Sequence, residues 1–186
     1  MKQGVRALGV AESYQANRST LAGAVTRRSR VVDGFVFGSC TVGGTDATDE
    51  IATLHRRLGR EDLQYLLVAG VGLAWYNIVD LHRLHEETRL PVLSVSFEES
   101  DGLEPGIRAA FDGDAATKRL EAYRSLPDRQ EFSVGSERLF CRSVGIDSQD
   151  AKRVIRAFTP EGGRPEPVRV ARLAARAVDQ FLQADA

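Results

Sequence analysis

The chain has 186 residues, of which 42% are hydrophobic, so it is long enough for one domain with a sizeable core. Its 25 basic and 26 acidic residues give a formal net charge of −1, which excludes an overall field that would draw the protein to nucleic acid or a membrane. Two cysteines without CxxC spacing and three histidines argue against a zinc site, and no segment approaches the about 20 apolar residues of a membrane helix.

The first part of the chain is predicted to be extended. Its start, MKQGVRALGV, leads into a strand-like segment without a signal-peptide pattern, so we expect a cytoplasmic protein. Three β-favouring runs separated by polar breaks predict an antiparallel meander: Val5–Val10, Leu21–Thr26 and Val31–Val42.

A helix is predicted after Gly43-Gly44. Asp46 and its polar neighbours offer N-cap residues ahead of Ile51, Leu54 and Leu58, and Gly59 is the expected end.

Alternating strands and helices follow. Tyr65–Ala69 and Pro91–Val95 are continuous apolar runs of the kind found in parallel strands, and the segment Asn77–Thr88 between them is predicted to be helical. The sequence therefore predicts an α/β fold with a mixed sheet of about five strands, a three-strand antiparallel meander followed by parallel strands, flanked by helices.

The last third adds smaller elements. A helix is predicted around Ala115–Tyr123, and Phe132–Val134 with Leu139–Cys141 predict a small hairpin. Two amphipathic helices are expected near the end, one from Asp147 or Ser148 to Phe158 and one that begins near Pro165. With no repeat or linker in view, residues 1–186 are interpreted as a single domain.

Four segments carry a resemblance to a known family: RALGVAES, GGTDAT, VAGVGLAWYNIVDL, and GIDSQDAKRVI followed by GRPEPVRVARLAA. They resemble the archaeal endonuclease dU family, whose members are similar to endonuclease V. The resemblance implies a ribonuclease H-like fold, in agreement with the strand and helix order above. It also implies a role in DNA repair, as a metal-dependent nuclease acting on DNA with deaminated bases such as deoxyuridine.

In such a nuclease, clustered carboxylates hold Mg²⁺ or Mn²⁺, which activates a water and stabilises charge on the phosphate. Two of the family's expected acids are replaced here, by Ala11 and Ala69. The histidine expected in the final helix is Arg172, and a basic position after the fifth strand is Phe97 or Glu98.

Glu12, Asp46 and Asp80 are the remaining catalytic candidates, and Glu12 with Asp46 would bind the metal if a site survives. Each has a simpler interpretation. Glu12 is displaced to the opposite face of the strand from Ala11, where it would be a surface acid. Asp46 can cap the following helix through its carboxylate, and Asp80 can form a surface ion pair with Arg83.

Aromatic and basic residues supply candidate nucleic-acid contacts. Trp75 and Tyr76, beside Asn77, could stack on an exposed base, although aromatics near buried strands are more often part of the core. Arg164, Arg169 and Arg172 follow helical spacing and could position a phosphate backbone, or keep an amphipathic helix soluble.

Two functions stay open. The first is a divergent endonuclease dU-like protein that recognises DNA or other nucleic acid, with cutting weakened or lost at a degenerate metal site. The second is a non-catalytic scaffold that binds nucleic acid or protein on the same fold. Convergence of the Glu12, Asp46 and Asp80 carboxylates would favour the nuclease, and dispersed acids would favour the scaffold.

Overall fold

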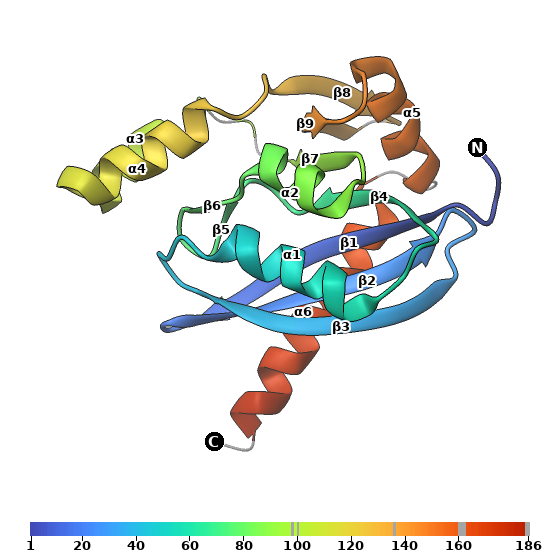
Figure 1. Ribbon diagram of the computed structural model, residues 1–186, viewed down its shortest axis with the longest axis horizontal. Helices are drawn as coiled ribbons and strands as arrows, with labels where there is room; N and C mark the ends of the chain where they lie inside the picture. The colour runs from blue at the N-terminus through green and yellow to red at the C-terminus, as the bar shows by residue number, and fades with distance from the viewer. Residues whose placement is uncertain (98, 100, 136, 160–162, 185–186) are drawn as a thin grey trace.

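The computed structural model describes residues 1–97, 99, 101–135, 137–159 and 163–184, which form a mixed sheet with helices on both faces (Figure 1). The sheet has seven strands in the order β3-β2-β1-β4-β7-β9-β8. The strand bounds are β1 Arg6–Gln15, β2 Arg18–Arg27, β3 Val32–Thr41, β4 Leu63–Val68, β7 Val92–Ser96, β8 Gln130–Val134 and β9 Glu137–Val144.

The predicted meander and parallel strands are both present. β1, β2 and β3 pair in antiparallel fashion, whereas β4 pairs in parallel with β1 and with β7. The expected number of about five strands is wrong, because the predicted hairpin, β8 and β9, joins the sheet. β9 pairs antiparallel with β7 from Val92↔Val144 to Ser96↔Phe140, a long-range pairing that leaves no mark in the local pattern.

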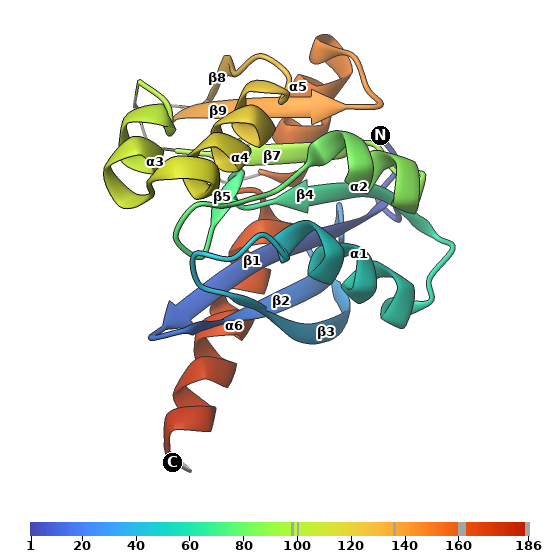
Figure 2. The ribbon, with the colours of Figure 1, turned by 60° about the vertical axis from the view of Figure 1, so that its left-hand side comes forward.

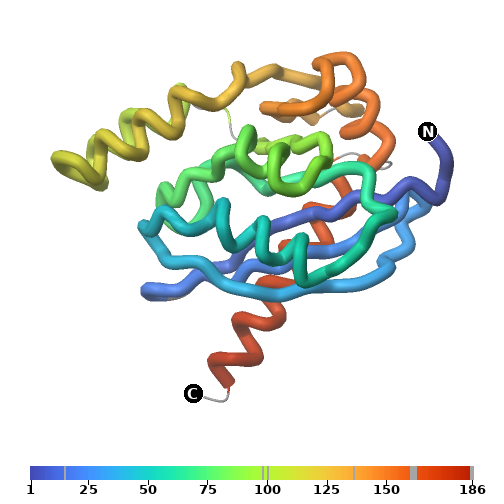
Figure 3. The backbone as a smooth tube through the Cα atoms, viewed as in Figure 1, coloured from blue at the N-terminus to red at the C-terminus, as the bar shows by residue number. Residues whose placement is uncertain are grey.

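Helices cover the two faces of the sheet. α1 (Ala47–Leu58) and α2 (Leu81–Thr88) lie on one face, and α5 (Ser148–Phe158) and α6 (Glu166–Ala184) lie on the other, as Figure 2 shows. α6 crosses β1 and β2 and then projects beyond the sheet, which the backbone tube makes plain (Figure 3). Gly59 ends α1 in a left-handed conformation, as predicted.

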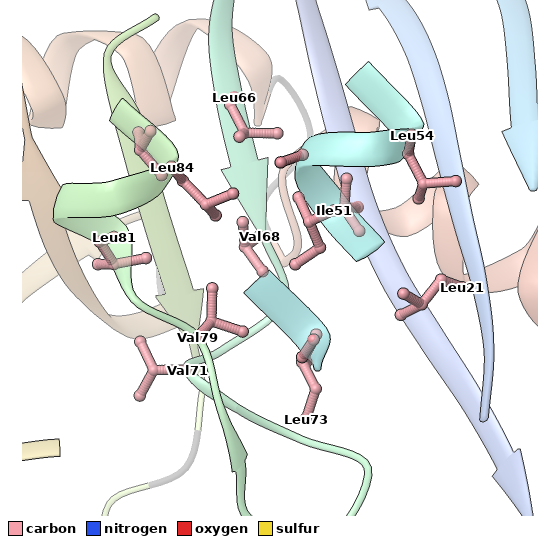
Figure 4. Close-up of a cluster of buried hydrophobic side chains, with 14 of the residues drawn as sticks. Leu21, Ile51, Leu54, Leu66, Val68, Val71, Leu73, Val79, Leu81 and Leu84 are labelled. Atoms are coloured by element: carbon pink, nitrogen blue, oxygen red, sulfur yellow. The ribbon is translucent and has the colours of Figure 1, made fainter. Parts of the chain in front are cut away.

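The main core lies between the sheet and the α1–α2 layer. Leu66 and Val68 of β4 point toward Ile51 and Leu54 of α1 and toward Leu84 of α2 (Figure 4). All five side chains are fully buried, and each stabilises the fold by about 1.5–3 kcal/mol relative to an exposed position. This packing holds the parallel strands in place, and with them the edge of the sheet where β1, β4 and β7 lead out.

The connection between β4 and α2 differs from the prediction. Asn77 and Ile78 form β6, which pairs with β5 (Gly72–Leu73) in a small hairpin, so the helix predicted from Asn77 begins only at Leu81. The predicted helix around Ala115–Tyr123 lies within α4 (Gly113–Arg124), which α3 (Glu104–Ala110) precedes. In the described part of the chain, no helix combines the length and apolar character needed to cross a bilayer. A cytoplasmic location stays a prediction.

Candidate functional site

A cavity of about 260 Å³ opens where the parallel strands β1, β4 and β7 lead out of the sheet. Ala11 follows the last β1 residue that pairs with β4, Ala69 follows β4, and Ser94 to Ser96 end β7. All of these residues line the cavity. Open α/β sheets generally bind ligands at the carboxyl ends of their strands, so this edge is the expected place for a site.

Ala11 and Ala69 are neighbours at the floor of this cavity. The amide of Ala69 donates a 3.0 Å hydrogen bond to the carbonyl of Val10, which continues the β1–β4 register to this pair. Ala11 is fully buried and packs with Ala24 and with Ala171 of α6. The two positions where the family resemblance implies carboxylates therefore meet, and the surface they form is apolar.

Positive charge dominates the walls of the cavity. Four arginines line it: Arg129 before β8, Arg142 on β9, Arg164 before α6, and Arg172 on α6. Among the lining residues that the structure describes, Glu12 supplies the one carboxylate. Because like charges gathered around one cavity repel cations and attract anions, the arrangement suits an anion.

Three of these arginines stack on aromatic rings that also line the cavity. The guanidinium carbons lie above ring centroids in the pairs Arg129 on Phe140 at 3.8 Å, Arg142 on Tyr123 at 5.1 Å, and Arg164 on Phe97 at 5.0 Å. Stacking orders the planar guanidinium group, and its N–H groups point outward in the plane, where phosphate oxygens can accept them. Arg142 also donates to the Tyr123 hydroxyl at 3.0 Å and to the Pro127 carbonyl, which anchors it further.

These residues do not fit a divalent metal ion. Mg²⁺ and Mn²⁺ prefer several carboxylate or carbonyl oxygens, whereas the described walls offer Glu12 against four guanidinium groups. No group of three or more His, Cys, Asp or Glu side chains elsewhere in the described ranges is placed to bind a metal. Phe97 lines the cavity, and Glu98 lies outside the described residues.

Glu12 is the one catalytic candidate that reaches the cavity. It follows Ala11 along β1 and accepts a hydrogen bond from the hydroxyl of Ser19 on β2. Glu12 is partly buried, whereas the simpler interpretation expected a solvent-exposed surface acid.

Asp46 belongs to a separate polar network beside α1. Its carboxylate accepts hydrogen bonds from the Thr41 amide at 3.1 Å, the Thr41 hydroxyl at 2.8 Å and the Asn77 amide group at 2.7 Å. The prediction that this carboxylate caps α1 is wrong, because it turns back toward β3 instead. Burial opposes its ionisation, yet the bonds from Asn77 and Thr41 outweigh burial and lower the pKa of Asp46.

Asp80 is the N-cap of α2. Its carboxylate accepts a 3.0 Å hydrogen bond from the backbone amide of Arg83, which satisfies a donor in the first turn. The predicted ion pair with the Arg83 side chain is not the contact that forms, since that guanidinium pairs with Asp49 and Glu87. Asp80 is not among the residues that line the cavity, and neither is Asp46. Of the three acids, Glu12 alone therefore lines this cavity.

Two of the predicted nucleic-acid contacts have structural roles. Asn77 is 0% exposed; it accepts from the Ala47 amide at 3.0 Å and donates to the Thr41 carbonyl and to Asp46, so it cannot reach a ligand. Arg169 forms a two-pronged ion pair with Glu166 at 2.6 and 2.8 Å on the exposed side of α6, away from the cavity lining. Arg164 and Arg172 do line the cavity.

Trp75 and Tyr76 form the turn of the β5–β6 hairpin. Ala74, Trp75 and Tyr76 have φ angles of 40°, 61° and 57°, three successive residues in the left-handed region that costs about 1–2 kcal/mol for each residue with a side chain. Trp75 stays 51% exposed, whereas Tyr76 packs edge-on against Phe111 at a centroid distance of 6.3 Å. The core interpretation therefore fits Tyr76 and not Trp75.

Sequence reasoning missed Arg129 and Arg142. Both lie where the sequence predicted little regular structure, or only a short hairpin, so neither could be assigned to a site. One signal was available: Phe140 and Arg142 are two residues apart on a strand and so share a face. This spacing places both side chains toward the cavity, but it does not identify their stacking partners, Arg129 and Tyr123, which lie in other segments.

Comparison with known proteins gives a family match over most of the chain. A family model described as endonuclease dU matches residues 3–179. A UPF0215 protein of Pyrobaculum aerophilum is 33% identical over 180 residues, with 95% of each chain covered. A UPF0215 protein of Thermococcus kodakarensis is 34% identical over 163 residues, covering 87% of this chain and 82% of the relative.

Solved structures share the fold. A protein of unknown function from Archaeoglobus fulgidus superposes with a TM-score of 0.83 at 27% identity, covering 94% of this chain and 98% of that one. The catalytic domain of human endonuclease V gives a TM-score of 0.61 at 19% identity, covering 97% and 84%. Endonuclease V of Ciona intestinalis, in complex with DNA containing an inosine, gives 0.61 at 12% identity, covering 96% and 87%.

Proposed function

The chain belongs to the endonuclease dU family, and from this premise we propose that it binds DNA carrying a deaminated base through the arginine-lined cavity, without metal-dependent cutting. The observation that carries the proposal is the set of three arginine–aromatic pairs, with Arg172, around the exits of β1, β4 and β7. Solved endonuclease V structures of the same fold include a DNA complex, which supports the choice of ligand.

The chemistry of the cavity supports a phosphate ligand. Guanidinium groups form paired hydrogen bonds with phosphate oxygens, and arginines ordered by stacking lose little freedom when they bind. At about 260 Å³ the cavity is slightly smaller than the about 300–1,000 Å³ of small-molecule sites, so it suits one nucleotide unit of a strand rather than a duplex. Sequence selectivity would come from contacts outside the phosphate.

The donor set of the cavity does not support metal-dependent cutting. A metal-dependent nuclease needs clustered carboxylates to hold the ion that activates water. Ala11 and Ala69 occupy the two central positions, and Asp46 and Asp80 hold other structural bonds. Glu12 then acts as a single acid in a basic cavity, which is the arrangement of a binding protein on a nuclease fold.

A metal-dependent endonuclease is the second candidate, and one observation favours it: the Glu12 side chain does line the cavity. In that case Glu12 would be essential, and Mg²⁺ or Mn²⁺ would be required for both binding and cutting. A protein-binding scaffold is the third outcome, in which the cavity arginines contribute nothing to DNA affinity.

The test is equilibrium binding of labelled oligonucleotides with a single deoxyuridine or deoxyinosine. The variant Arg164→Ala/Arg172→Ala removes two cavity arginines, and Arg153→Ala, which removes an exposed arginine of α5 paired with Asp150, is the matched control. We expect a loss of about 10- to 100-fold for the double variant, a salt dependence shallower by about two phosphate contacts, and no change for the control. Equal affinities for all three proteins would overturn the proposal.

Cleavage is measured on the same oligonucleotides with Mg²⁺ or Mn²⁺. We expect intact DNA with the native protein. Metal-dependent cutting that disappears in Glu12→Ala and in Asp46→Ala would instead establish the endonuclease.

A further inference from the structure

Trp75 is the one tryptophan of the chain, and it lies half exposed at the tip of the β5–β6 hairpin. Large aromatic side chains of folded proteins normally bury most of their surface, because burial of apolar surface stabilises the fold. Phe181 is more exposed still, so exposure alone does not mark a site, and what sets Trp75 apart is the ordered turn that holds it.

The turn that presents Trp75 is strained and firmly held. Three successive residues have positive φ angles, with Trp75 at the centre. The Gly43 amide donates a 2.7 Å hydrogen bond to the Ala74 carbonyl on one side, and the buried Asn77 anchors the other side. Strain of this kind persists where the surroundings enforce it, and it concentrates at functional sites.

Tyr76 fixes the orientation of the neighbouring indole. Its ring lies 5.4 Å from that of Trp75 in an edge-on arrangement, and its hydroxyl end occupies the space where Gly106 of α3 has no side chain. One edge of the indole faces Gly43, where an added Cβ would lie 3.6 Å from Cδ1 of Trp75. The indole is thus supported along part of its surface, and the rest is open.

The turn is continuous with the cavity. Val71, Gly72 and Leu73 line the cavity, and Trp75 follows Leu73 by two residues, so their Cα atoms lie within about 8 Å. A strand whose phosphate occupies the cavity would therefore pass close to the indole.

We propose that Trp75 is a stacking platform for an unpaired base, and that the substrate class of the cavity is single-stranded nucleic acid or a strand locally opened from its partner. This inference rests on the proposed function. Every base has an aromatic face that can stack on an indole, so the platform tolerates any sequence. A paired base in a duplex already stacks on its neighbours, so the platform distinguishes unpaired from paired strands.

The test uses the fluorescence of Trp75, which no other tryptophan obscures. Native protein is titrated with a single-stranded oligonucleotide, with the same sequence as a blunt duplex, and with a single strand whose central nucleotides are abasic. We expect strong quenching with the intact single strand and little with the other two. Trp75→Ala should weaken single-strand affinity by about 5- to 100-fold, with duplex affinity unchanged within about twofold.

Two variants control for indirect effects. Trp75→Phe keeps an aromatic face and should lose less affinity than Trp75→Ala, and Phe181→Ala removes an exposed aromatic of α6 and should change nothing. Binding of single strands without quenching, or with the same affinity in Trp75→Ala, would overturn this inference and leave the proposed function standing. Native protein that binds no oligonucleotide would overturn the proposed function and this inference with it.

Discussion

Two polar regions of the molecule contain the positions that the family resemblance marks as acidic, and they differ in what surrounds them. In the cavity, Ala11 and Ala69 form an apolar floor beneath four arginines. Beside α1, Asp46 survives, and its carboxylate is held by hydrogen bonds from Thr41 and Asn77. In the cavity the two marked positions are alanines, whereas the acid beside α1 forms hydrogen bonds that support the fold.

An acid in a nuclease fold can bind the catalytic metal, or it can support local structure, and the two regions allow these roles to be told apart. Asp46 and Asp80 organise local structure, by joining β3 to the β5–β6 hairpin and by capping α2. Neither role needs a metal, so neither acid is by itself a sign of catalysis. A motif match therefore indicates the fold more reliably than the activity.

The largest expected effect is on the reactivity of the two cysteine thiols, Cys141 at the cavity and Cys40 near Asp46. Burial raises the pKa of Cys141, which borders the cavity, from 9.0 to about 12. Burial followed by the charges of Asp46 and Glu12 raises the pKa of Cys40 to about 12 as well. The thiolate population falls about a thousandfold, so neither thiol should react with an aromatic disulfide reagent at pH 8 until urea is added. Rapid labelling of Cys141 alone in the native protein would contradict this expectation and would show that solvent and reagent reach its thiol through the cavity.

Removing Asn77 should destabilise the network region strongly. Asn77→Ala leaves the buried Ala47 amide without its partner, and it removes one hydrogen bond each from the Thr41 carbonyl and from Asp46, which keep bonds from Gly44 and from Thr41. We expect the free energy of unfolding to fall by about 2–5 kcal/mol, measured by urea denaturation. Asn17→Ala, at an exposed position in the β1–β2 turn, should stay within about 0.5 kcal/mol of the native protein. Equal stability of the two variants would contradict the structural role of Asn77.

Asn77 also shows what the sequence could and could not reveal. The strand and helix patterns predicted the meander, the parallel strands and α1, because those signals are local. The partners of Asn77 lie 30 or more residues away in the chain, so its neighbours Trp75 and Tyr76 made it resemble a surface residue. The hairpin of β8 and β9 was predicted, but its place in the main sheet was not, since β9 joins β7 across an intervening segment of about 40 residues.

The candidate site was predictable in part. Ala11 and Ala69, which the resemblance marks as positions of interest, line the cavity, and so do the predicted contacts Arg164 and Arg172. Arg129 was not predictable, because the segment before β8 carries no periodic pattern. The aromatic partners of the arginines come from three different segments, β9, α4 and the loop after β7, and only the folded chain brings them together.

Asp46 should make stability depend on pH in a defined window. Its folded pKa is lowered, so its contribution is present above the unfolded pKa of about 3.9 and is lost as the pH falls through the folded value. Asp46→Asn should lower the free energy of unfolding by about 1–2 kcal/mol at pH 7, with the gap to the native protein closing below about pH 4. Urea denaturation at pH 7 and pH 3 measures both. A gap of the same size at both values would show that the charge contributes nothing.

Substitution of Glu12 should change DNA affinity by the smallest factor, but the direction of the change is the most informative. As the one described carboxylate of a basic cavity, it repels a phosphate, so Glu12→Gln should bind single-stranded DNA about 3- to 10-fold more tightly. Gln can still accept the hydrogen bond from Ser19, which keeps the local geometry. Weaker binding in Glu12→Gln would indicate that this carboxylate holds a cation on which DNA depends.

The most direct test of the central claim is the affinity of the native protein for a deoxyuridine-containing single strand, measured in EDTA and again in millimolar Mg²⁺ at matched ionic strength. If the cavity is an anion site built from arginines, the dissociation constants should agree within about threefold, and the DNA should remain intact in both. Binding that appears only with Mg²⁺, accompanied by cut strands, would contradict the account and restore a metal-dependent nuclease.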